Sequence, residues 1–262
     1  MLELRDVSVT YGKNPSPTVE GVSLSMKRGD IVSIVGESGS GKSTVIRAIL
    51  GCLPGDGYVS AGDILFEGRS LPGLSKEEWR ELRGTEISMI FQDSGAMLNP
   101  IRRIGSQYVE YIRTHEKIPK REAWAKAVEM LERMRLPNGG HIMDSYPFQL
   151  SGGMRQRVGI AMAMTFQPKL LLGDEPTSAL DVTTQAQIVR QMMELRDQYQ
   201  TSIILVTHNL GVAAYMSDWI LVMKDGRVVE TGDRERILRD PATEYTKSLL
   251  EAVPKMGGER YV

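Results

Sequence analysis

Two glycine-rich segments of this sequence carry residue types that bind anions. The first, Gly-Glu-Ser-Gly-Ser-Gly-Lys-Ser at 36–43, fits the pattern G-x-x-x-x-G-K-[ST]. In this pattern the glycines let backbone N–H groups surround phosphates, the lysine reaches the β- and γ-phosphates, and the serine hydroxyl binds Mg²⁺. The pattern therefore predicts a nucleotide site that contains Gly36, Ser38, Gly39, Ser40, Gly41, Lys42, Ser43 and Thr44.

A pair of acids follows an apolar run later in the chain. Leu-Leu-Leu-Gly ends in Asp174 and Glu175, and a buried strand would place both acids at the carboxyl edge of a sheet, where α/β proteins bind ligands. There Asp174 is expected to hold Mg²⁺, directly or through water, and Glu175 to polarise the attacking water. The alternative is a solvated acidic strand end, but the phosphate-binding loop favours the catalytic interpretation.

The second glycine-rich segment is Gln-Leu-Ser-Gly-Gly-Met at 149–154, which heads an apolar run with helical spacing. The N–H groups at the start of such a helix, together with a serine hydroxyl, form another place for an anion. One chain therefore carries two anion sites more than a hundred residues apart.

The elements that must position these residues follow from the hydrophobic spacing. Strands are predicted at 2–11, 21–26, 30–36, 62–68, 87–91, 169–175 and 202–208, helices at 41–53, 77–83, 120–136, 183–199 and 211–217 and from Ser151, and a hairpin at 219–232 with an Asp-Gly turn. Strands that alternate with helices indicate an α/β fold with a mostly parallel sheet. The strand pattern is absent from about 93 to 167, which indicates a helical insertion.

Composition excludes several classes of protein. The chain has 262 residues, with 41% apolar and 25% charged residues, and its 32 Lys and Arg against 33 Asp and Glu give no overall basic field for nucleic acid. No apolar run approaches the roughly 20 residues that span a bilayer, and the N-terminus lacks the features of a signal peptide. The single cysteine, Cys52, excludes an intrachain disulfide framework and is expected to be buried. A cytosolic chain is expected, which reaches a membrane only through a partner.

The order of the motifs resembles that of ATP-binding cassette (ABC) ATPases over essentially the whole chain. The segment LSGGMRQR at 150–157 is similar to the family's signature motif and SALD at 178–181 to its D-loop. Gln92 matches the Q-loop glutamine, His208 the switch histidine, and Tyr11 the aromatic residue that stacks on adenine.

The resemblance implies one nucleotide-binding domain over 1–262. Its expected parts are a P-loop core with an N-terminal antiparallel β-subdomain (1–92 and 168–262) and an inserted helical subdomain that carries the signature (93–167). Gln92 would contact Mg²⁺ and the attacking water, and His208 the γ-phosphate. In this family two cassettes face each other head to tail, so that Ser151, Gly152 and Gly153 would bind the partner's nucleotide. Each chain would then contribute half of the residues to each of the two nucleotide sites.

Several segments resemble the oligopeptide, dipeptide and nickel importer ATPases, among them QDSGAMLNPIRRIGSQ at 92–107 and the late DPATEYTKSLLEAVP. This resemblance implies a second ATPase subunit, in a heterodimer or a homodimer, two membrane permease subunits, and indirectly an extracytoplasmic substrate-binding protein. The chain would then lie at the cytoplasmic face of the membrane, docked to the permease through 93–150. ATP and Mg²⁺ are the expected cofactors. No iron–sulfur cluster is predicted, because the C-terminal segment holds no cysteine.

Two other functions stay open from the sequence. A soluble ABC ATPase acting on ribosomes or DNA is one, although such proteins usually carry two cassettes or a long coiled-coil insertion. A regulatory module that binds nucleotide without turnover is the other, and the presence of Glu175, His208 and the D-loop segment disfavours it. The transported substrate, peptide or nickel, is not specified by these residues.

Overall fold

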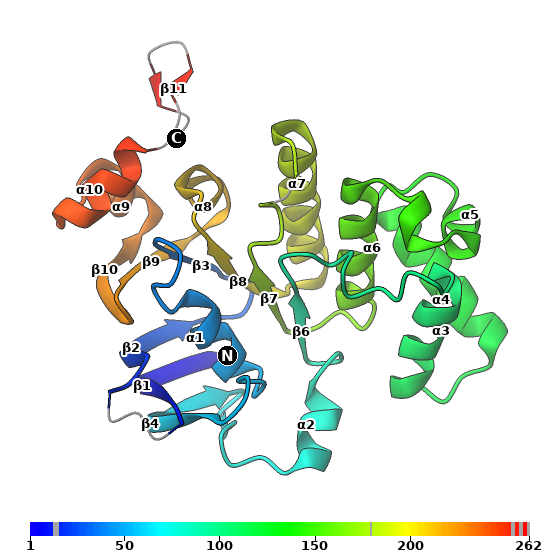
Figure 1. The fold of residues 1–262 in the computed structure, drawn as a ribbon, viewed down its shortest axis with the longest axis horizontal. Coiled ribbons are helices and arrows are strands. Elements are labelled where there is room, and N and C mark those ends of the chain that lie inside the picture. The colour runs from blue at the N-terminus through cyan, green and yellow to red at the C-terminus, as the bar shows by residue number, and fades with distance from the viewer. Residues whose placement is uncertain (13–15, 179, 253–254, 257–258, 261–262) are drawn as a thin grey trace. The chain divides into compact units, whose positions relative to one another are not determined.

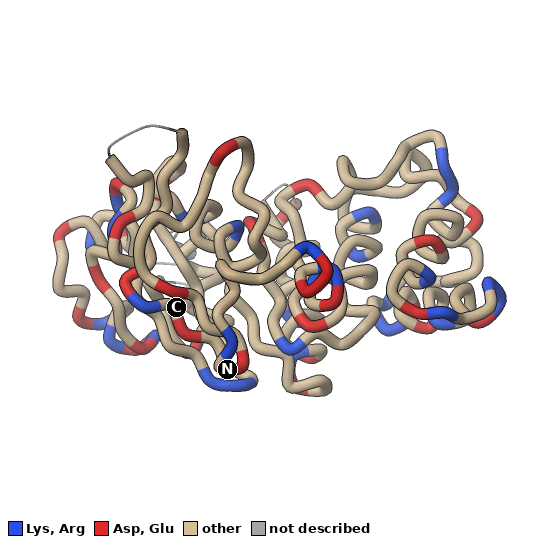
Figure 2. Tube along the Cα trace, turned by 90° about the horizontal axis from the view of Figure 1, so that it is seen from below, with Lys and Arg blue, Asp and Glu red and all other residues tan. Residues whose placement is uncertain are grey.

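The computed structural model describes residues 1–12, 16–178, 180–252, 255–256 and 259–260. The chain divides into two compact units, one made of Met1–Trp79 and Ser202–Val262 and the other of Arg80–Thr201. Figure 1 labels the elements of both units, and Figure 2 shows that the positions of acidic and basic residues are interspersed along the trace of each.

An antiparallel sheet opens the first unit, with the strand order β2-β1-β4-β5. Its strands are β1 Leu2–Tyr11, β2 Val19–Met26, β4 Gly57–Phe66 and β5 Arg69–Ser70. Strand β4 begins five residues before its predicted start. The first half of β4 shows no alternation of buried apolar and exposed polar residues, since even its apolar Tyr58 is 52% exposed. Register pairs such as Val9↔Val59 nevertheless join this half to β1.

The strands of a second sheet that belong to this unit follow the order β10-β9-β3-β8. Its strands are β3 Ile31–Val35, β8 Ser202–Thr207, β9 Trp219–Lys224 and β10 Arg227–Asp233. Strand β3 runs parallel to β8 and to β9, and all residues of β3 and β8 are buried, as expected of parallel strands covered on both faces. The predicted hairpin joins β9 to β10, and Asp225 and Gly226 at its turn both have positive φ.

The helices of the first unit include α1 Lys42–Ile49, α8 Leu210–Met216, α9 Arg234–Arg239 and α10 Glu244–Glu251, and a short β11–β12 hairpin (Lys255–Met256 and Glu259–Arg260) follows them. Helix α2, Lys76–Leu82, starts with a capping box, in which Ser75 N donates to the Glu78 carboxylate and Glu78 N donates to Ser75 Oγ. Val35, at the end of β3, shares one apolar cluster with Leu210 of α8 and Leu250 of α10. The C-terminal helices therefore pack on the same core as the strand that leads into the phosphate-binding loop.

Cys52 corrects one expectation, because it is exposed rather than buried. Helix α1 ends at Ile49, four residues before its predicted end, and Gly51 adopts φ +63°. A glycine in this left-handed conformation is a common helix terminator. Cys52 therefore follows the turn that ends the helix and does not reach the helix's buried face.

The second unit is mainly helical. Its strands β6 Ile87–Ile90 and β7 Leu170–Asp174 pair in parallel. Its helices are α3 Ile104–His115, α4 Lys120–Arg133, α5 Gly139–Asp144, α6 Gly152–Met164 and α7 Val182–Tyr199, with a 3-10 turn at Pro147–Gln149. All of residues 93–167 are described and none lies in a strand, which confirms the predicted helical character of this segment. No helix among the described residues is long and apolar enough to cross a membrane.

Candidate functional site

The phosphate-binding loop lies in the first unit, between the end of β3 and the start of α1. Gly36 has φ +151°, and a Cβ added there would lie 2.2 Å from the carbonyl oxygen of Met223 in β9. Gly41 has φ +97°, with Val19 only 2.9 Å from its hypothetical Cβ. Both positions therefore require glycine, for conformation and for space. The strand, loop and helix predicted from the sequence are present in that order.

The amino group of Lys42 is held inside the loop. Its Nζ donates hydrogen bonds to the carbonyl oxygens of Gly36, at 2.8 Å, and Glu37, at 2.6 Å, and lies 3.4 Å from Ser40 Oγ. Lys42 and Ser40 are both 5% exposed. The loop thus fixes a buried cation at the place where the sequence predicts phosphate binding.

The outer residues of the loop face solvent. Ser38 and Gly39 are exposed, and Ser43 and Thr44, in the first turn of α1, are half-buried. That first turn contains no acidic residue. The helix therefore carries no carboxylate in its own first turn that would offset the positive end of its dipole, which favours an anion there.

Two further predicted residues belong to the first unit. Tyr11 ends β1 opposite Gly57, where a Cβ would lie 2.5 Å from the Tyr11 ring, so that the ring packs on the backbone of β4. His208 follows β8 and is exposed. Next to it, the Asn209 side chain accepts hydrogen bonds from Gly211 N at 2.9 Å and Val212 N at 3.3 Å and so caps α8.

In the second unit, the structure brings Gln92 and Glu175 together. The Gln92 Nε2 atom lies 3.5 Å from a Glu175 carboxylate oxygen and 3.5 Å from Ser178 Oγ. Asp174, the last residue of β7, is 6% exposed, and Glu175 is half-buried with φ +46°. A left-handed conformation outside glycine costs free energy, and it is found disproportionately at functional sites.

The second glycine-rich segment forms the start of α6. Ser151 is its N-cap, and its Oγ accepts a hydrogen bond from Met154 N at 3.3 Å. Ser151 and Gly152 are exposed, whereas a Cβ on Gly153 would lie 2.7 Å from Thr184 in α7. Gly153 therefore lets the starts of α6 and α7 approach closely, while Ser151 and Gly152 stay open to solvent.

The segment between β7 and α7 holds the residues predicted as a D-loop. Asp181 caps α7 by accepting a hydrogen bond from Thr184 N at 2.9 Å. Hydrogen bonds from the backbone N–H and the side chain of Thr184 lower the pKa of the Asp181 carboxyl below its ordinary value. Ala179, in the same segment, lies outside the described residues.

Sequence reasoning did not single out Gln156, which the structure places between these parts. Its side chain is 5% exposed, its Nε2 donates to Pro176 O at 2.7 Å, and its Oε1 accepts from Ser94 N at 3.4 Å. Gln156 thereby joins α6 to the residue after Glu175 and to the segment after Gln92. A hollow of about 120 Å³ beside it is lined by Gln92, Asp93, Gly95, Gly152, Arg155, Gln156, Pro176 and Leu180.

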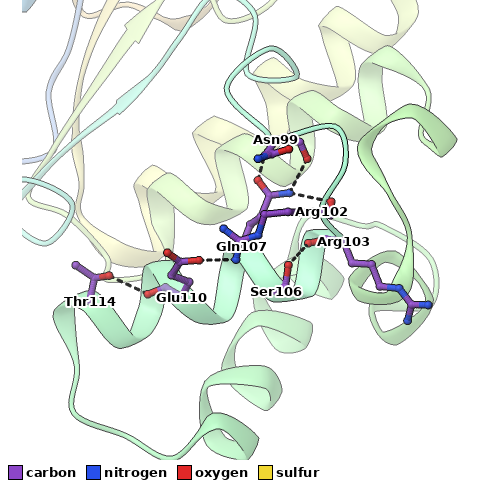
Figure 3. Close-up of polar contacts among 7 residues, drawn as sticks. All are labelled: Asn99, Arg102, Arg103, Ser106, Gln107, Glu110 and Thr114. Carbon is purple, nitrogen blue, oxygen red and sulfur yellow. Dashed lines mark hydrogen bonds and ion pairs between the residues drawn. The ribbon is translucent and has the colours of Figure 1, made fainter.

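The segment after Gln92 leads into α3 through a network of polar contacts, drawn in Figure 3. Gln107 accepts a hydrogen bond from Asn99 N at 2.8 Å and donates to Asn99 O at 3.1 Å and to Arg102 O at 3.0 Å. Arg102 forms an ion pair with Glu110. Next to this ordered segment, Ile101 is 82% exposed and Met97 is 61% exposed.

Comparison with known proteins gives consistent matches. A family model described as "ABC transporter" matches residues 19–178. The chain is 46% identical over 260 residues to the oligopeptide transport ATP-binding protein OppD of Bacillus subtilis strain 168, covering 98% of this chain and 72% of OppD. It is 42% identical over 262 residues to the dipeptide transport ATP-binding protein DppD of Escherichia coli K12, covering 99% of this chain and 80% of DppD.

Among solved structures, a dimeric ATP-binding cassette in a post-hydrolysis state with ADP and phosphate matches with a TM-score of 0.78. The two chains are 29% identical, and the match covers 89% of this chain and 99% of the cassette.

Proposed function

The chain belongs to the ABC transporter family, and from this premise we propose how its residues carry out the family's reaction. It is the ATP-binding and ATP-hydrolysing subunit of an importer. The observation that best supports the residue assignments is the buried Lys42 amino group inside the glycine-rich loop.

We propose that the loop binds the phosphates of ATP through Gly36, Ser38, Gly39, Ser40, Gly41, Lys42, Ser43 and Thr44. The hydrogen bonds that Lys42 makes to Gly36 and Glu37 hold its charge in place, so that little side-chain entropy is lost when phosphate arrives. Tyr11 is proposed to stack on the adenine base.

Mg²⁺ is proposed as the metal, held by the Ser43 hydroxyl, the Gln92 side chain and Asp174. These are hard oxygen donors of the kind that Mg²⁺ prefers, and Mg²⁺ bound to nucleotide keeps several waters and phosphate oxygens as ligands. It therefore needs no cluster of three His, Cys, Asp or Glu side chains, and the described residues contain none. When bound, Mg²⁺ neutralises charge that develops on the phosphates.

For the hydrolytic step we propose that Glu175 accepts a proton from the attacking water. The Gln92 amide, 3.5 Å from the Glu175 carboxylate, orients that carboxylate and contacts the same water. His208 is proposed to donate a hydrogen bond to the γ-phosphate and so to stabilise charge in the transition state.

The start of α6 is proposed to bind the nucleotide of a second cassette. Ser151 and Gly152 are exposed and stand at a helix N-terminus, so their hydroxyl and N–H groups are available to an anion carried by another molecule. ATP between two cassettes would then hold the dimer together, and hydrolysis would release it. The partner is proposed to be a related ATPase subunit in a heterodimer, with a homodimer as the second possibility.

The chain is further proposed to act at the cytoplasmic face of the membrane through two permease subunits, with a substrate-binding protein outside. Residues 93–150, where Ile101 and Met97 are exposed, are the proposed docking surface. Peptides are the proposed cargo, because the named relatives transport oligopeptides and dipeptides. Nickel has no comparable support, and no iron–sulfur cluster is proposed. We also propose the division into a P-loop core with β-subdomain (1–92 and 168–262) and a helical subdomain (93–167).

Two substitutions test these assignments in the assembled transporter. Lys42→Ala should weaken ATP binding, measured by titration with a fluorescent nucleotide, and wild-type affinity would contradict the phosphate assignment. Glu175→Gln should preserve ATP binding, slow phosphate release by at least tenfold and prolong the ATP-bound state, measured as unhydrolysed ATP that stays with the transporter through size-exclusion chromatography. Wild-type turnover in Glu175→Gln would contradict the role of Glu175 as the base.

A further inference from the structure

The C-terminal helix α10 contacts the phosphate-binding loop through one side chain. The hydroxyl of Tyr245 accepts a hydrogen bond from the backbone N–H of Glu37 at 3.0 Å. Glu37, Ser38 and Gly39 are otherwise the exposed part of the loop. Tyr245, more than two hundred positions away along the chain, therefore binds the loop at its exposed part.

The position of this hydrogen bond gives it a direct link to Lys42. The N–H of Glu37 and the carbonyl group of Gly36 belong to the same peptide unit, and that carbonyl accepts a hydrogen bond from Lys42 Nζ at 2.8 Å. A trans peptide unit is rigid and planar, and its C=O and N–H bonds point in opposite directions. One rigid group thus has Tyr245 bound at one end and the Lys42 amino group bound at the other.

Tyr245 is itself well fixed. Its side chain packs against the apolar cluster that contains Val35 and Leu250. Lys224 Nζ lies 4.9 Å from the centre of its ring, within the range of a cation–π interaction. The hydroxyl is therefore presented to the loop by a packed ring, not by a freely rotating side chain.

The start of α10 is fixed by a buried carboxylate. Glu230 of β10 is 6% exposed and accepts hydrogen bonds from Ala242 N at 2.7 Å, Thr243 N at 3.1 Å and Thr243 Oγ1 at 3.1 Å. Burial raises the pKa of Glu230, but hydrogen bonds from Thr246, Ala242 and Thr243 outweigh burial and hold that pKa below its ordinary value. Strand β10, residues 242–243 at the start of α10, and Tyr245 are therefore connected by hydrogen bonds and chain continuity.

We propose that Tyr245 is a positioning residue for Lys42, acting through the Gly36–Glu37 peptide unit, and that α10 thereby sets the affinity of the loop for the nucleotide phosphates. This inference rests on the proposed role of Lys42 in phosphate binding. Without the hydroxyl, the peptide unit loses one of its two anchors, and the carbonyl group that orients the Lys42 amino group can rotate. Loss of the hydroxyl should therefore weaken nucleotide binding and leave the proton transfer at Glu175 unchanged.

Tyr245→Phe tests the proposal, since phenylalanine keeps the ring, its packing and the contact with Lys224. A single hydrogen bond is worth a net factor of about two to ten in an equilibrium, so the Kd for ATP should rise about twofold to tenfold. In the assembled transporter, KM for ATP should rise by a similar factor, while kcat and the thermal unfolding midpoint stay near wild-type values. Tyr215→Phe is the matched control, because Tyr215 is 59% exposed on α8, and its Kd should not change.

The result that overturns the proposal is an unchanged Kd in Tyr245→Phe alongside weakened binding in Lys42→Ala. A lowered unfolding midpoint with an unchanged Kd would also overturn it, because it would limit Tyr245 to a structural role. If Lys42→Ala binds ATP like the wild type, the proposed function of the loop fails instead. ATP titrations of the two variants therefore distinguish failure of the Tyr245 proposal from failure of the proposed phosphate site.

Discussion

Replacing Gln156 with methionine should disconnect the start of α6 from the loops on either side of it. Methionine has nearly the same volume, so the substitution removes the amide while leaving little cavity. Two buried backbone groups, Pro176 O and Ser94 N, lose the hydrogen-bond partner they have in the native structure. An unpaired buried polar group costs about 1–3 kcal/mol.

The two contacts are unequal, because the bond to Pro176 is 2.7 Å long and the bond to Ser94 is 3.4 Å long. If the bond to Pro176 contributes the whole range of about 1–3 kcal/mol and the bond to Ser94 about 1 kcal/mol, the free energy of unfolding falls by about 2–4 kcal/mol. Total stability of a domain is only about 5–15 kcal/mol, so this loss should be plain as a lower urea midpoint at an unchanged m-value.

The assay compares Gln156→Met with Gln198→Met in urea unfolding followed by tryptophan fluorescence. Gln198 is an exposed residue of α7, so its replacement should change the free energy of unfolding by less than about 0.5 kcal/mol. Phosphate release should also slow in Gln156→Met, because Pro176 directly follows the proposed base Glu175. Equal stability and equal turnover in the two variants would refute the assignment of Gln156 as a bridge.

Three further outcomes follow from buried contacts. Glu230→Gln should lower stability at pH 7. Because folding lowers the pKa of Glu230, the wild type should lose this advantage only as the pH falls below the ordinary titration range of a glutamate, so that the urea midpoints of the two proteins converge in acid. Tyr108→Phe removes a hydroxyl that is fully buried and hydrogen-bonded at 2.8 Å, and calorimetry should show a loss of about 1 kcal/mol with unchanged ATP affinity. Gly159→Ala should lower the free energy of unfolding by about 1–3 kcal/mol, because the added Cβ would lie 2.4 Å from Ser94 Cβ. A urea midpoint equal to that of the wild type would contradict this, because it would mean that the segment around Ser94 moves aside without cost.

The parts of the fold that could be predicted are those whose signals are local. A buried β-branched strand, a glycine-rich loop and a helix follow one another within 31–49, so the loop around Lys42 could be placed without tertiary information. The alternating strands and helices likewise predicted a mostly parallel sheet, and β3 does pair in parallel with β8, and β6 with β7. The hairpin at 225–226 was evident from its Asp-Gly turn.

Other features depend on contacts that no local pattern indicates. Helix α5 has six residues, too few for a helical period to be evident, and the start of α3 is obscured by the Pro-Ile-Arg-Arg segment before it. Gln156 contacts a residue 62 positions away and Tyr245 one 208 positions away. Such pairs form only when the chain has folded, and a glutamine or tyrosine in isolation gives no signal of them.

The single exposed thiol of Cys52 has a practical consequence for following this protein in solution. Lys42 begins the eight-residue helix α1 and Cys52 lies just beyond its end, so a maleimide dye would sit about 12 Å or more along the helix axis from the lysine. One dye per chain could thus be attached at a defined position. A donor dye here and an acceptor dye on the proposed partner subunit would then report, through energy transfer, whether the two approach when ATP binds and separate after hydrolysis.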